Sequence, residues 1–127
     1  MAAIPTLTAP SAAPPAALPV PYAVLLQADL RIGQIVSATP VAGSRENLCQ
    51  ILVELGDGEV GTAMSKLPGI DPATLPGTLV VVACHIEPRP IAGIMAKVLL
   101  VTVRSSDRKH SRLIVPSAPI EPGCQVG

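Results

Sequence analysis

The sequence predicts an all-β domain, a small five-stranded barrel with one short helical turn, preceded by an extended tail rich in proline and alanine. Two observations support the barrel. Phe and Trp are absent and Tyr22 is the only aromatic residue, so the core must be built from Val, Ile, Leu and Ala, whose β-branched members favour strands. From residue 29 onward, short apolar runs alternate with glycine, proline and aspartate turn signals. A change of composition at residue 28 marks the tail.

Residues 1–28 form the predicted tail and residues 29–127 the predicted domain. The tail holds nine alanines, six prolines and no charge, whereas the domain holds all nine acidic and all nine basic residues. Proline at this density prevents a continuous helix and favours extended polyproline II segments. The tail cannot bury a core of its own. We expect it either to lie along a partner as an arm or to be a leader without a role.

The first half of the domain predicts three strands. Leu30–Thr39 forms the first, and Gly33 within it suggests a bulge or sharp coil of the kind that small barrels need. Asn47–Leu55 forms the second strand. Gly56–Gly58 is a tight hairpin turn, so Glu59–Met64 is expected to return antiparallel to the second strand.

The second half begins with a helical turn. Asp71 followed by Pro72 fits a helix N-cap with proline in the first turn. Three strands are predicted after it: Thr78–Ile86, which is apolar enough to be buried on both faces, Ile91–Arg104 with a bend near Gly93, and Arg112–Val115 after a polar loop. Five or six short strands with a helical turn between the third and fourth is the layout of an OB-fold.

Charge and cysteine content narrow the class of protein. The formal net charge is zero, so the overall basic excess of a dedicated nucleic-acid binder is absent, although a local basic patch remains compatible with it. Three cysteines, an odd number without a CxxC pair, argue against a disulfide framework or a zinc site. Cys49 and Cys84 lie in apolar runs and are expected to be small core side chains.

Targeting signals are weak. No apolar run approaches the roughly 20 residues that span a bilayer. No Lys or Arg precedes Arg31, which argues against a secretory signal and a typical mitochondrial transit peptide. The lack of acidic residues in the tail keeps organellar import open. We therefore expect an intracellular protein, cytoplasmic or organellar (mitochondrial included), and not a secreted one.

Four segments in the right order resemble a known family. They are Asp29–Ile35, Leu55–Glu59, Val80–Gly93 with its proline, basic and glycine signature, and Pro119–Gly123. Together they resemble the tRNA-binding domain of endothelial-monocyte-activating polypeptide, of the C-terminal part of methionyl- and some tyrosyl-tRNA synthetases, and of free-standing bacterial tRNA-binding proteins. The resemblance covers about 99 of the 127 residues and implies an OB-fold that binds tRNA without catalysis.

Three functional positions differ from the family pattern. Cys49 stands where the family has the tyrosine of Asp-x-Leu-Tyr, and Met64-Ser65 stands where it has Ser-Gly. Met95–Val98 stands where the family has Ser-x-x-Met, whose serine the resemblance ties to RNA binding.

The best candidate for RNA contact is a basic cluster in the loop before the last strand, a position that OB-folds use for ligands. Only Asp107 opposes its charge in the sequence. Arg89 and Lys97 could line the adjacent face. The cluster consists of Arg104, Arg108, Lys109, His110 and Arg112. It could contact RNA phosphates, be a solvated loop that keeps a strand edge soluble, or dock on ribosomal RNA or an acidic protein.

No catalytic residue, metal site or cofactor is predicted. Ser65-Lys66 lacks a third partner. His85 and His110 are 25 residues apart, with no Asp, Glu or Cys at metal-ligand spacing around them. His85 is expected to be a hydrogen-bonded strand residue. The Gly56–Gly58 turn is too short for a phosphate loop, which has a longer glycine pattern before a helix. The chain is therefore not expected to be an enzyme.

Two functions remain open. The first is an RNA-binding accessory protein, acting on tRNA or ribosomal RNA within a larger complex. The alternative is a structural subunit of a large protein assembly that has lost tRNA binding and docks through its barrel and its N-terminal arm, because fold alone does not decide function. A homodimer is a third possibility, since the apolar stripe Val98–Val103 could form an interface, although core packing would also explain it.

Overall fold

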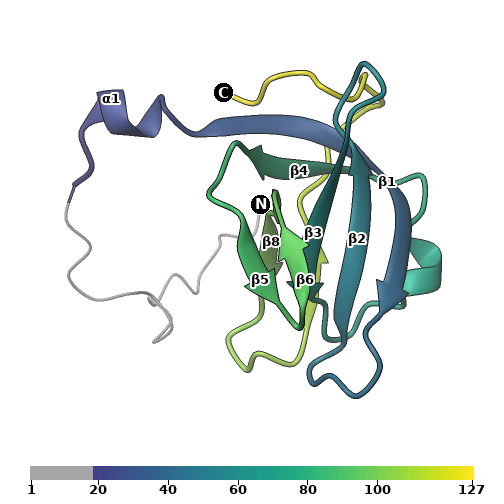
Figure 1. Cartoon of the computed structure of the whole chain (residues 1–127). Helices are drawn as coiled ribbons and strands as arrows, with labels where there is room; N and C mark the ends of the chain where they lie inside the picture. Colours follow the sequence, from purple (N-terminus) through teal and green to yellow (C-terminus); the bar gives the residue numbers. More distant parts are fainter. Residues whose placement is uncertain (1–18) are drawn as a thin grey trace, which may run out of the picture.

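A computed structural model describes residues 19–127 (Figure 1). These residues form one helical turn, nine short strands and one 3₁₀ turn. In chain order the elements are α1 (Tyr22–Leu25), β1 (Asp29–Pro40), β2 (Leu48–Glu54), β3 (Val60–Lys66), η1 (Pro72–Thr74), β4 (Leu79–Cys84), β5 (Arg89–Ile91), β6 (Ile94–Ala96), β7 (Leu99–Leu100), β8 (Thr102–Arg104) and β9 (Ser111–Leu113).

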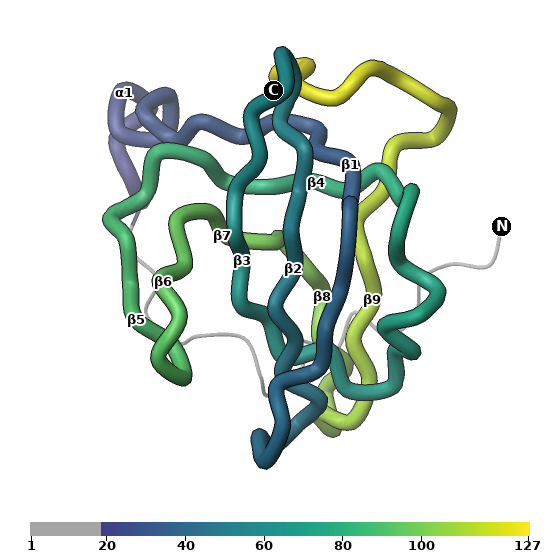
Figure 2. The backbone as a smooth tube through the Cα atoms, turned by 45° about the vertical axis from the view of Figure 1, so that its right-hand side comes forward, coloured from purple at the N-terminus to yellow at the C-terminus, as the bar shows by residue number. Residues whose placement is uncertain are grey.

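The main sheet is a nearly closed antiparallel barrel with the strand order β3-β2-β1-β4-β7. The long strand β1 pairs with β4 through its first half and with β2 through its second half. The barrel closes between β3 and the segment before β7, where the backbone N–H groups of Lys97 and Val98 donate to the carbonyl oxygen of Thr62 at 2.9 and 3.2 Å. Figure 2 shows β7 behind β3 on this side. The predicted five-stranded OB-fold is confirmed.

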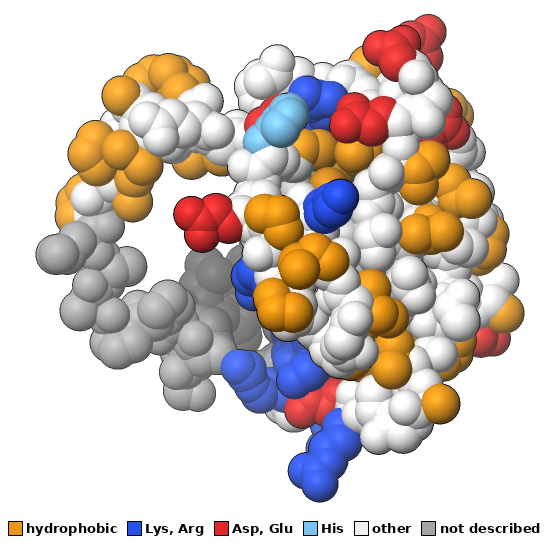
Figure 3. Space-filling model, viewed as in Figure 1, with side chains coloured by type: hydrophobic (Ala, Val, Ile, Leu, Met, Phe, Trp, Pro, Cys, Tyr) orange, Lys and Arg blue, Asp and Glu red, His pale blue; other side chains and the backbone are white. Residues whose placement is uncertain are grey.

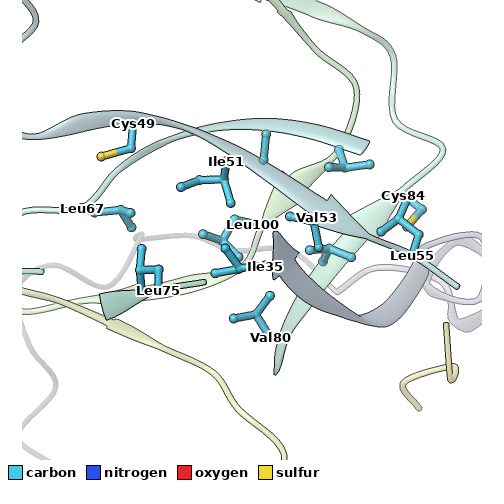
Figure 4. Close-up of a cluster of buried hydrophobic side chains, with 13 residues drawn as sticks. Ile35, Cys49, Ile51, Val53, Leu55, Leu67, Leu75, Val80, Cys84 and Leu100 are labelled. Atoms are coloured by element: carbon cyan, nitrogen blue, oxygen red, sulfur yellow. The ribbon is translucent and has the colours of Figure 1, made fainter. Parts of the chain in front are cut away.

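The core fills this barrel with small and aliphatic side chains from every strand of the main sheet, including Ala63 of β3 and Leu100 of β7 at its edges. Ile35, Ile51, Val53 and Val80 are essentially inaccessible to solvent and converge in Figure 4. The two sulfur-containing side chains Cys49 and Cys84 belong to the same cluster, as predicted from their apolar runs. Burial raises the pKa of both thiols, so neither is a reactive thiolate at neutral pH.

The helical turn after β3 forms as its sequence predicts. Asp71 is the N-cap residue, its carboxylate accepts from the backbone N–H of Ala73 at 3.0 Å, and Pro72 opens the turn. The prediction of one strand over Ile91–Arg104 is wrong. Ala92 and Gly93 both have positive φ, which is the geometry of a two-residue hairpin turn, so the segment folds into β5, β6, β7 and β8.

Gly33 does not mark the bulge that we expected. It pairs in regular register with Val80, and the irregularity of β1 lies between Ile35 and Ser37. What requires glycine is close packing: a Cβ at this position would overlap Val53 Cγ1 and approach the carbonyl oxygen of Glu54 to 3.2 Å.

Gly33→Ala is therefore expected to destabilise the barrel by about 1–3 kcal/mol, because the added methyl group overpacks a filled core. Urea unfolding followed by circular dichroism measures this change. Thr39→Ala, on an exposed position of the same strand, is the control and should stay within about 0.5 kcal/mol of the wild type. Equal stability of the two variants would contradict the packing argument.

The predicted tail lies mostly outside the described residues, so the boundary at residue 28 stays a prediction. Within residues 19–28, Tyr22–Leu25 form one helical turn that buries none of its side chains. Among the residues that the structure describes, no helix has the length and apolarity needed to cross a membrane.

Candidate nucleic-acid interface

Three loops meet at one end of the barrel: residues 41–47 after β1, residues 67–71 after β3, and residues 105–110 between β8 and β9. The side-chain amide of Asn47 joins the first two loops, because it donates to the carbonyl oxygens of Leu67 at 2.6 Å and Ile70 at 2.8 Å. The backbone N–H of Ser111, which follows the third loop, donates to the carbonyl oxygen of Pro68 at 2.8 Å and so joins the third loop to the second. The end is therefore a built surface, held by hydrogen bonds between the loops.

The turn between β8 and β9 is fixed by one carboxylate. Asp107 accepts from the hydroxyl of Ser105 at 2.6 Å and from the backbone N–H of Lys109 at 2.9 Å. These bonds, the Ser105 hydroxyl first, hold the pKa of Asp107 below its usual value. Arg108 sits at the tip with a positive φ, and Arg108 and Lys109 both have exposed side chains. The turn thus presents two adjacent cations to solvent from a fixed backbone.

The hairpin register separates the other two arginines of the predicted cluster. Arg104 pairs with the buried Ser111, whereas Arg112 pairs with the exposed Val103. Because paired residues of a hairpin share a face, Arg104 and Arg112 lie on opposite faces. Arg104 is half-buried and turns toward the β1–β2 loop.

Glu46 is the acidic neighbour of this cluster that the sequence did not reveal. Its carboxylate lies 3.7 Å from a guanidinium nitrogen of Arg104 and 3.6 Å from the ammonium nitrogen of Lys66. The expectation that only Asp107 opposes the cluster is therefore wrong. Figure 3 shows basic side chains gathered beside an acidic one at the lower end of the view, where the β1–β2 loop lies in Figure 1.

Lys66 was missed as a site residue, although one signal could have found it. The Gly56–Gly58 turn sets the β2–β3 register, which pairs Leu48 with Lys66 and so brings Lys66 next to Glu46. The contact with Arg104 has no such local signal, because it joins residues far apart in the chain.

Arg89 and Lys97 form a second, separate group at the base of the β5–β6 hairpin. Arg89 pairs with Ala96, the residue before Lys97. Lys97 also lines a cavity of about 240 Å³ together with Glu59 and His85. His85, Arg89 and Lys97 belong to segment 85–98, which joins β4 to β7. The basic loop at 105–110 comes after β7 closes the barrel, so it does not occupy the ligand-loop position that we assigned to it.

The outer face of β2 and β3 is covered by apolar side chains. Leu48, Met64 and Ala96 are buried there, and Ile91 and Ile94 of the β5–β6 hairpin pack against them. OB-folds use this face for ligands. Met64 from one departure from the family pattern, and Ala96 from within the Met95–Val98 segment of another, lie in this apolar contact. The face therefore offers no aromatic platform for stacking bases.

His85 lies just beyond β4 and not within the predicted strand. Its Nδ1 atom is hydrogen-bonded to Asp29, as expected of a satisfied histidine, and Arg31 donates two hydrogen bonds to the same carboxyl group at 3.0 and 3.1 Å. The Arg31 guanidinium is the main cause that holds the pKa of Asp29 below its usual value. Within the part of the chain that the structure describes, no group of three or more His, Cys, Asp or Glu side chains could hold a metal ion.

Comparison with known proteins identifies the sequence relatives. Residues 30–125 match the profile of the family described as "Putative tRNA binding domain". A methionine–tRNA ligase of Aromatoleum aromaticum is 33% identical over 95 residues, which are 70% of this chain and 13% of the ligase. The ligase of Methanopyrus kandleri is 32% identical over 75 residues, 59% of this chain and 11% of the ligase. The chain thus spans little more than a tenth of these curated relatives.

Solved structures show the same fold at low sequence identity. The chaperone CsaA of Bacillus anthracis superposes with a TM-score of 0.75 at 18% identity and covers 87% of this chain and 100% of CsaA. A MetRS-related protein of Pyrococcus horikoshii superposes with a TM-score of 0.78 at 17% identity, with coverage of 87% and 100%.

Proposed function

The chain belongs to the tRNA-binding domain family, and from that premise we propose that it binds the sugar–phosphate backbone of tRNA-type RNA without catalysing a reaction, as an accessory protein within a larger complex. The observation that carries the proposal is the Asp107-fixed turn, which presents Arg108 and Lys109 beside the cations of the barrel end. The ligase reaction of the relatives is not part of the proposal, because the chain matches only a small part of their length.

Charge must provide most of the affinity. Stacking on an aromatic side chain contributes about 1–3 kcal/mol per base in OB-folds, and this barrel has no Phe, Trp or Tyr between residues 29 and 127. Contacts to phosphates need only fixed cations and provide much of the affinity in protein–nucleic acid complexes. Such contacts recognise the shape of a folded RNA and not its sequence. Binding of this kind fits an intracellular protein, which is the setting we propose.

Arg108→Gln combined with Lys109→Gln is expected to weaken binding of tRNA by about tenfold and to lower the salt slope by about one unit for each phosphate that the variant no longer neutralises. Fluorescence anisotropy with labelled tRNA and the full chain measures both quantities. Both residues are exposed, so the melting temperature should stay unchanged.

The matched control is Arg89→Gln combined with Lys97→Gln, which removes the same charge from the second basic group. An equal loss of affinity in both double variants would indicate nonspecific attraction. A loss only in the control would move the interface to the β5–β6 hairpin, and no loss in either would contradict RNA binding through these cations.

A second candidate function, a structural subunit, is favoured by the surface of α1. Tyr22 and Leu26 are large, mainly apolar side chains, yet 73% and 63% of their surface areas are exposed to solvent. With Leu25, Leu30 and Val126 they line an apolar hollow of about 360 Å³. We call these five residues the α1 surface. Contiguous exposed apolar surface marks protein contacts, so a protein partner or a second copy of the chain could dock here.

The stripe Val98–Val103 is a weaker basis for a homodimer. Val98 and Leu100 are buried in the barrel core, so only Leu99 and Val103 are exposed large apolar residues of this stripe. Core packing explains the stripe, and the α1 surface is the better candidate for self-association.

A further inference from the structure

Lys66 and Arg104 lie on different strands, at the ends of β3 and β8, and share one acidic neighbour. We propose that these two cations form a binding site for a backbone phosphate of RNA, and that the carboxylate of Glu46 occupies this site in the free protein. The inference rests on the proposed RNA-binding function and adds to it a specific contact and its competitor.

The position of Glu46 is fixed by its neighbour. Glu46 and Asn47 both have left-handed backbone conformations, with φ of 58° and 55°. Two hydrogen bonds from the Asn47 side chain to the loop after β3 hold this conformation. A non-glycine residue rarely adopts positive φ without such support. The loop therefore places the carboxylate between the two cations.

The geometry of the bridge is that of an anion site. One oxygen, Oε2 of Glu46, is the atom nearest to both cations, at 3.6 Å from Lys66 and 3.7 Å from Arg104. An oxygen of a phosphate placed there would meet the same two cations, and arginine also suits phosphate because its guanidinium can donate two parallel hydrogen bonds.

The bridge is also weak enough to be displaced. Glu46 and Lys66 each expose about half of their side chains, and Arg104 exposes 31%. Exposed ion pairs contribute little to stability, so an incoming phosphate loses little when it displaces the carboxylate. In the free protein, Glu46 holds the like charges of Lys66 and Arg104 close together and so keeps the phosphate site in shape. When RNA binds, the same carboxylate competes with the phosphate for these cations.

The Glu46→Gln variant is therefore expected to bind tRNA about threefold to tenfold more tightly than the wild type. A change in affinity of this size corresponds to one exposed charge contact. The measurement is anisotropy with labelled tRNA and the full chain at several salt concentrations. Lys66→Gln and Arg104→Gln should each weaken binding, whereas Arg104→Lys, which keeps the charge, should weaken it less. Melting curves check that the half-buried position 104 still permits folding.

Two controls make the assignment specific. Asp57→Asn removes one negative charge from the β2–β3 turn and should leave affinity unchanged. Glu46→Gln in a Lys66→Gln, Arg104→Gln background should bring no gain, because the site that Glu46 occupies is gone.

The outcomes separate this inference from the proposed function. If the wild type binds tRNA and Arg108→Gln with Lys109→Gln weakens binding, but Glu46→Gln binds like the wild type, the inference fails alone. A gain that persists without Lys66 and Arg104, or that Asp57→Asn reproduces, would reduce Glu46 to general electrostatics and also overturn it. If neither the wild type nor Glu46→Gln binds tRNA, the proposed function and the inference fail together.

Discussion

Raising the salt concentration from about 50 to about 200 mM is expected to weaken tRNA binding by about a hundredfold. Besides the exposed Arg45 of the β1–β2 loop, the barrel end carries the four cations that the proposed contacts use: Arg104, Arg108, Lys109 and Lys66. A protein that neutralises about four phosphates releases the counterions condensed on them, and the logarithm of its affinity falls with a slope of about −0.9 per phosphate on a duplex. This steep dependence is the signature of binding by charge without base stacking.

The salt titration also distinguishes the two candidate functions. An apolar docking surface buries few charges, so its affinity should change little over the same range of salt. The full chain is titrated by anisotropy against labelled tRNA, and the double variant at Arg108 and Lys109 serves as the internal control with a slope shallower by about two units. A shallow slope for the wild type would show that phosphates are not the main contact and would contradict the proposed interface.

The fold could be predicted from the sequence because its signals are local. The Gly56–Gly58 turn and the alternation on both sides of it set the β2–β3 hairpin, and Asp71 with Pro72 sets the 3₁₀ turn. The failure over Ile91–Arg104 has a physical reason. Ala92 takes a positive φ that its side chain does not favour, so the sequence carries only half of the usual two-residue turn signal.

The candidate site was only partly predictable for the opposite reason. The sequence places Arg104, Arg108, Lys109 and Arg112 within nine residues, but the hairpin register puts Arg104 and Arg112 on different faces. The sequence separates Glu46 from Arg104 by 58 positions. The fold nevertheless brings a carboxylate oxygen of Glu46 within 3.7 Å of a guanidinium nitrogen of Arg104. A contact across the barrel depends on how three loops pack, and no single segment encodes that packing.

Replacing Leu25 and Leu26 by Asp is expected to release the protein from any assembly that it joins through the α1 surface. Both side chains are exposed, at 60% and 63%, so the barrel itself should fold and melt as before. In an apolar contact each carboxylate would lose its hydration without gaining a partner, and we expect the contact to weaken by at least about a hundredfold. Gel filtration of a gentle lysate, with and without ribonuclease, measures the native size.

The control replaces two exposed valines elsewhere, Val36 and Val115, by Asp, which adds the same charge away from α1. A large complex that survives ribonuclease and the control but disappears in the α1 variant would support the structural-subunit function. If the purified chain alone has the mass of two copies, the partner is a second copy; one copy points to another protein. A complex that collapses with ribonuclease and ignores the α1 variant would mean that RNA holds it, because only phosphate contacts require the nucleic acid.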